Sequence, residues 1–243
     1  MQLAAFAARQ VDAMDLTFIA ETFWRLMGAL PLTLEVWALS VSIGCVLAMG
    51  LTWMRVSGSR PLELFARGYI FVFRGSPLLI QLFVIYYGLS TVGFIRYGPL
   101  WPLFRDAFFC AVLSLALCTA AYSSEIFRGA LAAVPQGQIE AAKACGMSRL
   151  TLFCRIIFPI ALRQALPAYS TEVISMTKAT ALVSLVTLWD MMSIALKIRN
   201  DTLVTYTPLI VAGAIYFVLN FLIARAFIAA EYYLSAHQRR RVL

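Results

Sequence analysis

The chain has 243 residues, of which 62% are hydrophobic and 13% are charged, and its mean hydropathy is +0.82. So few charges cannot give a soluble domain its polar surface, which excludes both an ordinary cytosolic enzyme and a disordered chain. The net charge of +8 does not indicate nucleic-acid binding, because the basic residues lie between and beside long apolar runs, as topology signals do. Composition therefore predicts a polytopic membrane protein.

The first 22 residues mix charged and apolar side chains. They contain no basic stretch followed by an apolar core and a small-residue cleavage site, so we predict no cleavable signal peptide. An amphipathic segment at the membrane surface is the expectation for this part of the chain.

Five apolar runs are long enough to cross a bilayer, which takes about 20 residues of helix. They cover about residues 26–54, 62–89, 106–121 (extendable to 126), 166–188 and 207–233. We therefore predict an all-α membrane protein with about five transmembrane helices, organised as a single transmembrane domain over residues 1–243.

Basic residues in the loops predict how these spans are oriented in the membrane. One set of loops, together with the C-terminal tail, holds ten of them: Arg55, Arg60, Arg128, Lys143, Arg149, Arg155, Arg163 and Arg239–Arg241. The other set holds six: Arg9, Arg25, Arg96, Arg105, Lys197 and Arg199. Because basic loops stay in the cytoplasm, we expect the N-terminus outside and the C-terminus in the cytoplasm, where the arginine triplet anchors the tail.

Arg74 lies near the middle of the second apolar run. An arginine at that depth costs at least about 2.5–3.5 kcal/mol on insertion scales, so it needs a reason. Gly75, Ser76 and Pro77 follow it, and serine at an N-cap with proline at the first helical position predicts a broken span with a new half-helix from Pro77. Such a half-helix directs free N–H groups at an anion, as transporters do for a substrate carboxylate. The alternative is that Arg74 snorkels or pairs with an acid of another helix.

Two further charges, Glu172 and Lys178, lie inside the fourth run. Polar side chains beside them are Ser175, Thr177 and Thr180. Six residues turn a regular helix by about 600°, so the two charges point about 120° apart and each faces a cavity or another helix. Glu172 is a candidate for binding a cationic group, and the alternative is an ion pair with Arg74. Asp190, at the outer end of this run, is a candidate for closing the pocket.

Other chemistry-bearing residues have structural interpretations. Glu125 and Arg128, three residues apart, are predicted to form a local ion pair. The five cysteines show no Cys-x-x-Cys spacing, and the single histidine, His237, lies in the basic tail, so no disulfide framework or metal site is predicted. Because no phosphate-binding loop, nucleophile elbow or magnesium-type carboxylate cluster is present, no intrinsic ATPase or hydrolase is predicted, and active transport would have to be driven by an ion gradient or by a separate subunit.

The one long polar stretch covers about residues 127–163. Residues 138–145 are mostly strong helix formers, and Gly146 follows them as a helix C-cap does. Ser148 can cap a second short helix, with Pro159 beyond it. The pattern predicts a helix, a glycine turn and a second helix on the cytoplasmic face, and an ordered loop of this length indicates a partner or a function.

Within that stretch, Glu140-Ala141-Ala142 is followed by Gly146, Ile156 and Pro159. This arrangement resembles the Glu-Ala-Ala loop of binding-protein-dependent ABC importer permeases, without a gap in the spacing. The resemblance implies that the segment is the coupling helix region and sits in a groove of a separate ATPase subunit. The residues that it assigns to this contact are Ile139, Glu140, Ala141, Ala142, Lys143, Ala144, Gly146, Met147 and Ser148.

A narrower set of motifs covers most of the chain. They are Arg-Gly-Ser-Pro-Leu-Leu-Ile-Gln-Leu-Phe at 74–83, Glu-Ile-Phe-Arg-Gly at 125–129, Pro-x-Gly-Gln at 135–138 and Lys-Ala-Thr-Ala-Leu at 178–182. Together they resemble the polar amino acid permeases, which usually have threonine where this chain has Ser76 and serine where it has Ala181. The stretches 172–174 and 189–206 are most similar to the histidine/lysine/arginine/ornithine and opine permeases.

The resemblance implies a type I ABC importer permease fold and a multi-pass permease subunit, not an enzyme, in the bacterial inner membrane. The implied substrate is a polar, cationic amino acid or an arginine-derived opine. Arg74 and Ser76 suit its carboxylate and Glu172 suits its cationic end. The candidate substrate-binding residues are Arg74, Ser76, Glu172, Ser175, Lys178, Thr180 and Asp190.

The implied partners are a second permease, either a paralogue or an identical copy, two ATPase subunits and a periplasmic substrate-binding protein. No cofactor is expected in this chain, since ATP and magnesium belong to the partner ATPase. The alternatives are an ion-coupled secondary amino acid transporter, which should show inverted repeats, and a structural membrane protein. The Glu-Ala-Ala loop argues against the first, and the three charges inside the spans have no explanation in the second.

Overall fold

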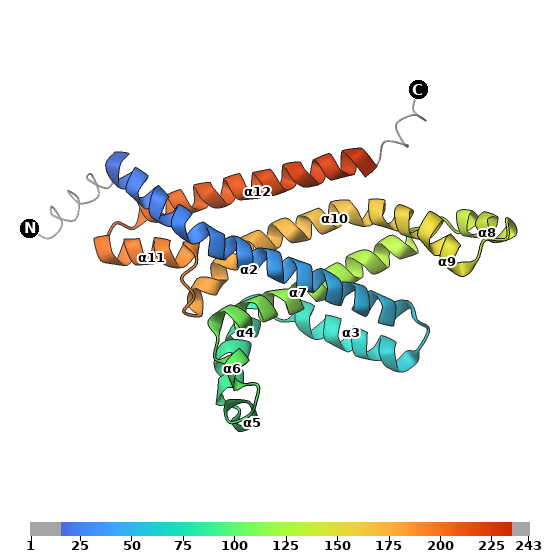
Figure 1. The fold of residues 1–243 in the computed structure, drawn as a ribbon, viewed down its shortest axis with the longest axis horizontal. Coiled ribbons are helices and arrows are strands. Elements are labelled where there is room, and N and C mark those ends of the chain that lie inside the picture. The colour runs from blue at the N-terminus through green and yellow to red at the C-terminus, as the bar shows by residue number, and fades with distance from the viewer. Residues whose placement is uncertain (1–15, 235–243) are drawn as a thin grey trace, which may run out of the picture. The chain divides into compact units, whose positions relative to one another are not determined.

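The computed structural model describes residues 16–234, and every regular element among them is a helix (Figure 1). In chain order these are α2 (Leu16–Val56), α3 (Arg60–Gly75), α4 (Leu78–Phe83), η1 (Val84–Gly88), η2 (Leu89–Thr91), α5 (Gly93–Arg96), α6 (Trp101–Phe104), α7 (Ala107–Ala132), α8 (Gln136–Ala144), α9 (Arg149–Leu152), η3 (Phe153–Ile157), α10 (Phe158–Ala179), η4 (Thr180–Leu185), α11 (Met191–Thr202) and α12 (Tyr206–Leu234). The all-α prediction is confirmed for this part of the chain. Of the surface segment expected within residues 1–22, residues 1–15 lie outside the described residues, and α2 begins at Leu16. The tail with His237 and Arg239–Arg241 also lies outside them.

Four helical stretches are long and apolar enough to cross a membrane, namely α2, α7, the run Arg149–Leu185 and α12. Helix α3 and the run Leu78–Thr91 pass the same test as a pair that is bent at the break between Gly75 and Leu78, and they count as a fifth span if the pair is one broken span. Four to five candidate spans agree with the prediction of about five, and a helix break lies where the sequence predicts it.

The fourth span begins earlier than expected. Its start was predicted at about residue 166, but α9, η3 and α10 follow one another without interruption from Arg149 to Ala179. Pro159, the second residue of α10, does not end this run, because it lies just after the π-helical turn η3, where the regular i→i−4 hydrogen-bond ladder is already interrupted.

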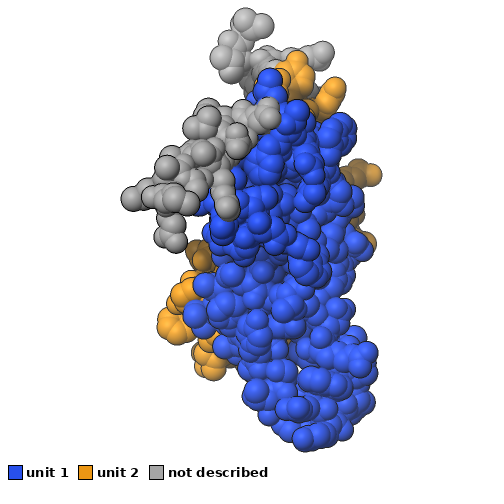
Figure 2. Space-filling model, turned by 90° about the vertical axis from the view of Figure 1, so that its left-hand side faces the viewer, with its two compact units in different colours: residues 1–40, 79–115, 176–221 blue, residues 41–78, 116–175, 222–243 orange. Residues whose placement is uncertain are grey.

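The described helices fall into two compact units, which Figure 2 shows in different colours. Unit 1 comprises residues 16–40, 79–115 and 176–221, and unit 2 comprises residues 41–78, 116–175 and 222–234. Helices α2, α7, α10 and α12 each contribute residues to both units. The single transmembrane domain over residues 1–243 stays a prediction.

Unit 1 has its apolar core between the first turns of α2, α11 and the first half of α12. Its buried members are Leu26, Met191, Ala195, Val211, Ala212 and Ile215. The hydroxyl of Thr33 accepts a hydrogen bond of 3.1 Å from the backbone N–H of Met191. This bond satisfies one of the N–H groups that the start of α11 would otherwise leave unpaired.

Unit 2 packs the second half of α2 against α3 and α7 through small and hydroxyl residues. Leu51, Ala66 and Ala120 form a buried cluster. The Thr52 hydroxyl donates to the carbonyl oxygen of Ser124 at 3.2 Å, which ties α2 to α7. Small side chains and side-chain to backbone hydrogen bonds are how helices associate in lipid, where no hydrophobic force drives them together.

Candidate functional site

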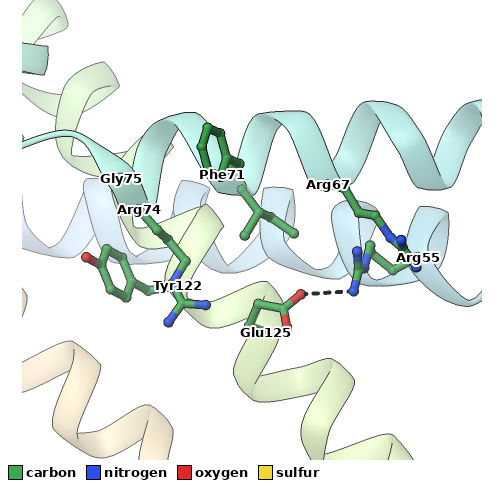
Figure 3. A pocket seen from close by; sticks show the side chains of 8 residues that line it. Arg55, Arg67, Phe71, Arg74, Gly75, Tyr122 and Glu125 are labelled. Atoms are coloured by element: carbon green, nitrogen blue, oxygen red, sulfur yellow. Dashed lines mark ion pairs between the residues drawn. The ribbon is translucent and has the colours of Figure 1, made fainter.

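A cavity of about 500 Å³ lies in unit 2 beside the last turns of α3 (Figure 3). Its lining comes from α2, α3 and α7 and consists of Arg55, Arg67, Ile70, Phe71, Arg74, Gly75, Tyr122 and Glu125. Three of these side chains are guanidinium cations and one is a carboxylate. The cavity is therefore cationic, and an anion is the ligand that its charge suits.

Arg74 is the guanidinium of this cavity that no carboxylate neutralises. Its Cζ atom lies 5.1 Å from the centre of the Tyr122 ring, a cation–π contact. No carboxylate of residues 16–234 lies within 4.0 Å of it, so the ion pair with Glu172 that the sequence left open does not form here. Arg74 thus reaches the cavity with its hydrogen-bond donors available to a ligand.

The other arginines of the cavity are engaged with carboxylates. Arg67 lies 2.6 Å from Glu63 of the same helix, and Arg55 of α2 lies 3.6 Å from Glu125 of α7. Glu125 also accepts a hydrogen bond of 2.9 Å from the Nε of Arg128 and lies 2.8 Å from its Nη2, which confirms the predicted local pair. The ion pair between Arg55 and Glu125 was not predicted, because Arg55 was interpreted only as a loop base. The position of Arg55 in the last turn of an apolar helix could have indicated such a partner.

Ser76 and Pro77 form the break between α3 and α4. Ser76 is extended (φ −110°, ψ 145°), as the residue before a proline prefers, and its hydroxyl donates to the carbonyl oxygen of Val72 at 2.7 Å. Helix α4 begins at Leu78, not at Pro77 as predicted. The hydroxyl of Ser76 thus satisfies a carbonyl group at the end of α3.

The remaining candidate substrate residues do not line this cavity. Glu172 is half-buried and Ser175 is exposed, both on the part of α10 that belongs to unit 2. Lys178 is exposed in the last turn of α10, within unit 1. Thr180 is buried in unit 1, where its hydroxyl donates to the carbonyl oxygen of Thr177 at 2.7 Å.

Asp190 is the N-cap of α11, a helix that the sequence analysis did not anticipate. Only 1% of the residue is exposed. Its carboxylate accepts from the backbone N–H groups of Met192 (3.3 Å) and Ser193 (3.0 Å) and from the Ser193 hydroxyl (2.6 Å). Burial raises the pKa of this carboxyl above its ordinary value, and the hydrogen bonds from Ser193 and Met192 oppose that rise.

The predicted helix, glycine turn and second helix are present in unit 2. Helix α8 ends at Ala144, and Gly146 follows in the left-handed region with φ +74°. The N–H groups of Gly146 and Met147 donate to the carbonyl oxygens of Lys143 and Ala142 at 2.9 and 3.2 Å. These two bonds form a Schellman C-cap, which glycine favours because its backbone adopts positive φ without strain.

The rest of the loop follows the same local rules. Ser148 caps α9, since its hydroxyl oxygen accepts from the backbone N–H of Thr151 at 3.3 Å. Ile139 of α8 packs on the apolar cluster around Ala130 and Ala161, which holds one face of α8 against its unit. Apart from Ile139 and Ala142, every residue of α8 is exposed, including Glu140, Ala141, Lys143 and Ala144. This open face is available for a partner.

The family follows from a comparison with known sequences. The sequence pattern of the family described as "Binding-protein-dependent transport system inner membrane component" matches residues 40–229. The chain belongs to this family. As an inner membrane component with several apolar helices, it is a multi-pass transport subunit, and these predictions are confirmed.

Named relatives cover nearly the whole chain. The octopine transport system permease protein of Rhizobium radiobacter is 50% identical over 229 residues, 94% of each chain. The nopaline transport system permease protein of Agrobacterium fabrum is 45% identical over 94% of this chain and 95% of its own. The histidine/lysine/arginine/ornithine transport system permease protein of Escherichia coli is 39% identical over 90% of this chain and 88% of its own.

Solved structures agree with the fold. A crystal structure of an amino acid ABC transporter with histidines matches with a TM-score of 0.79 at 32% identity, covering 90% of this chain and 98% of the other. An inward-facing methionine ABC transporter matches with a TM-score of 0.69 at 19% identity, covering 87% of this chain and 96% of the other, which supports the fold alone. The predicted ABC permease fold is confirmed.

Proposed function

We propose that this permease subunit serves an ABC importer that takes up arginine-derived opines or cationic amino acids. The support is the set of relatives, whose names give octopine, nopaline, and histidine, lysine, arginine and ornithine as cargo. Identity is higher to the octopine and nopaline permeases, at 50% and 45%, than to the basic amino acid permease, at 39%. This order favours opines. An ion-coupled secondary transporter is not favoured by the family.

The observation that carries the substrate site is the free guanidinium of Arg74 in its cationic cavity. Opines and amino acids carry a carboxylate, and a guanidinium that is not already paired binds a carboxylate by charge-assisted hydrogen bonds. In our proposal the carboxylate of the substrate approaches Arg74, with Ser76 at the adjoining helix break.

Glu172 is the proposed partner for the cationic end of the substrate. It belongs to the same unit as Arg74, and its side chain is half-buried. Ser175, Lys178 and Thr180 complete the proposed set. For Asp190 we propose a positioning role, because its carboxylate already accepts three hydrogen bonds within α11.

The second part of the proposal concerns energy coupling. Residues Ile139–Ala144 and Gly146–Ser148 would dock on a separate ATPase, which holds ATP and magnesium, through the exposed face of α8. This requires α8 in the cytoplasm, hence the N-terminus outside and the C-terminus inside. The complete importer would contain a second permease, two ATPase subunits and a periplasmic binding protein.

The test is uptake into liposomes that contain the permease with its ATPase and receive the binding protein from outside. Labelled octopine and arginine should accumulate only when ATP is enclosed. Arg74→Gln should lower uptake by about tenfold or more, because a hydrogen bond to a charged group contributes about 1.5–3 kcal/mol. Glu172→Gln should lower uptake of cationic substrate while the ATPase still co-purifies with the permease.

Arg96→Gln is the matched control, since it removes one exposed arginine at a distance in sequence from every proposed site residue and should leave uptake unchanged. Uptake driven by a proton gradient without ATPase would overturn the importer class. Wild-type uptake by Arg74→Gln would refute only the substrate-site assignment.

A further inference from the structure

A second cavity, of about 360 Å³, adjoins the Arg74 cavity in unit 2 and shares Arg55 and Arg67 with it. Its lining consists of Arg55, Val56, Glu63, Arg67, Arg128, Leu131 and Ala132. Three cations and one anion face this space. Even when Glu125, which pairs with Arg55 and Arg128, is counted with them, these side chains together keep a net positive charge.

The position of these residues along their helices places this cavity at the membrane surface. Arg55 and Val56 are the last two residues of α2, and Glu63 lies in the first turn of α3. Leu131 and Ala132 are the last residues of α7. The ends of apolar helices are where a chain leaves the hydrocarbon core, so this position suits the depth of the lipid headgroups.

The guanidinium groups have donors to spare for an additional anion. Arg55 makes only the 3.6 Å contact with Glu125, and its Nε is buried with no hydrogen-bond partner in the described chain. Arg67 and Arg128 each face a single carboxylate, whereas a guanidinium carries five N–H donors. Their side chains are 59% and 37% exposed, so a ligand can reach them.

Large apolar side chains stand exposed on the same helix ends. Trp53 and Val56 of α2 are 61% and 55% exposed, and Leu64 and Phe65 of α3 are 72% and 62% exposed. A cationic hollow at headgroup depth, bordered by exposed apolar and aromatic side chains, matches the two ends of a phospholipid.

We propose that this interfacial cavity binds the phosphate group of an anionic phospholipid, with the acyl chains lying along the exposed apolar side chains of α2 and α3. The net positive charge selects an anionic headgroup over a zwitterionic one, because both carry a phosphate but only the former keeps a net negative charge. The bound headgroup joins α2, α3 and α7 at one membrane surface.

The test is native mass spectrometry of the full chain, purified in mild detergent with the subunits that accompany it and titrated with phosphatidylglycerol or phosphatidylcholine. The tightest site of the wild type should prefer phosphatidylglycerol by at least about tenfold. The double variant Arg55→Gln with Arg67→Gln should bind it about 10- to 30-fold more weakly, given the contribution of each basic residue at a membrane surface.

Two matched variants separate lost charge from lost structure. Arg55→Lys with Arg67→Lys keeps the charge and should weaken binding by less than about threefold. Arg96→Gln with Arg105→Gln removes the same charge from two exposed residues elsewhere and should bind as the wild type does. If the double glutamine variant does not fold, the lysine pair still tests the site, because a loss as large as tenfold there contradicts a charge-selected headgroup.

Other outcomes overturn the proposal. Equal binding of the two lipids, or undiminished phosphatidylglycerol binding by a folded double glutamine variant, contradicts it. Displacement of phosphatidylglycerol by a few millimolar inorganic phosphate would assign the cavity to a soluble anion instead of a lipid. None of these outcomes bears on uptake, so the importer function is tested separately.

Discussion

Gly44 lies buried in α2 against Thr119 of α7. A Cβ atom at this position would lie 2.7 Å from the Thr119 Cβ and 3.0 Å from the carbonyl oxygen of Ala116. Since backbone cannot give way as a flexible side chain does, Gly44→Ala should push the two helices apart. We expect the free energy of unfolding to fall by about 1–3 kcal/mol, measured by thermal unfolding in detergent.

Gly50→Ala provides the control for this substitution, because Gly50 lies in the same helix and a Cβ there meets nothing within 4 Å. It should leave stability unchanged or raise it by up to about 1 kcal/mol, the difference in helix propensity between the two residues. If both variants lose the same free energy of unfolding, the loss comes from placing alanine in α2, and the close approach of Gly44 to α7 does not explain it.

At the level of single residues, the sequence predicted the structural features that depend on residues close by in the chain. The N-cap role of Ser148, the left-handed Gly146 and the Glu125–Arg128 pair all follow from spacings of four residues or fewer. The bond from Thr52 to Ser124 joins residues 72 apart. It depends on the register of α2 against α7, which no local pattern encodes, and the Arg55–Glu125 ion pair depends on the same register.

At the level of elements, the glycine turn after α8 fixes the direction in which the coupling segment leaves that helix. Gly146 has φ +74°, so Gly146→Ala should cost about 1 kcal/mol, and Gly146→Asp should distort the turn more. We expect Gly146→Asp to lower uptake at least severalfold while the ATPase subunit still hydrolyses ATP. Measuring uptake and hydrolysis in the same liposomes gives the ratio of the two.

Gly137→Ala is the comparison for that experiment, since Gly137 lies in α8 itself, lacks a positive φ and has open space around it. It should transport as the wild type does. If Gly146→Asp also keeps the wild-type ratio of uptake to hydrolysis, α8 and its turn do not couple the ATPase to the membrane helices.

The break in the second span and the start of the fourth span show which element boundaries a sequence can predict. Ser76-Pro77 carries its own signal, because the residue before proline prefers an extended backbone. The run from Arg149 to Ala179 continues past Pro159 because a π-turn at Phe153–Ile157 precedes it, and residue preference alone placed the start of the span too late. Helix α11 was missed because its cap, Asp190, was considered only as a ligand for substrate.

At the level of the whole molecule, orientation links the two proposals on function, since α8 can meet an ATPase only from the cytoplasm. The cysteines offer a direct measurement. Cys145 and Cys154 are exposed in the stretch around α8 and α9, whereas Cys110 and Cys118 are buried and Cys45 is half-buried. In a Cys154→Ser variant, Cys145 is therefore the one cysteine of the chain that is classed as exposed, beside the half-buried Cys45.

A membrane-impermeant maleimide should label Cys145 severalfold faster in inside-out vesicles than in right-side-out vesicles, when the permease is expressed without its ATPase. Asp201→Cys, introduced with Cys145→Ser and Cys154→Ser, places a thiol at an exposed position in the last turn of α11 and should show the opposite preference. The two variants form a reciprocal pair, because α8 and the end of α11 are separated by a single further span, the run Arg149–Leu185. The reverse pattern in both would place α8 outside the cell, where no ATPase could use it, and would contradict the coupling proposal together with the orientation.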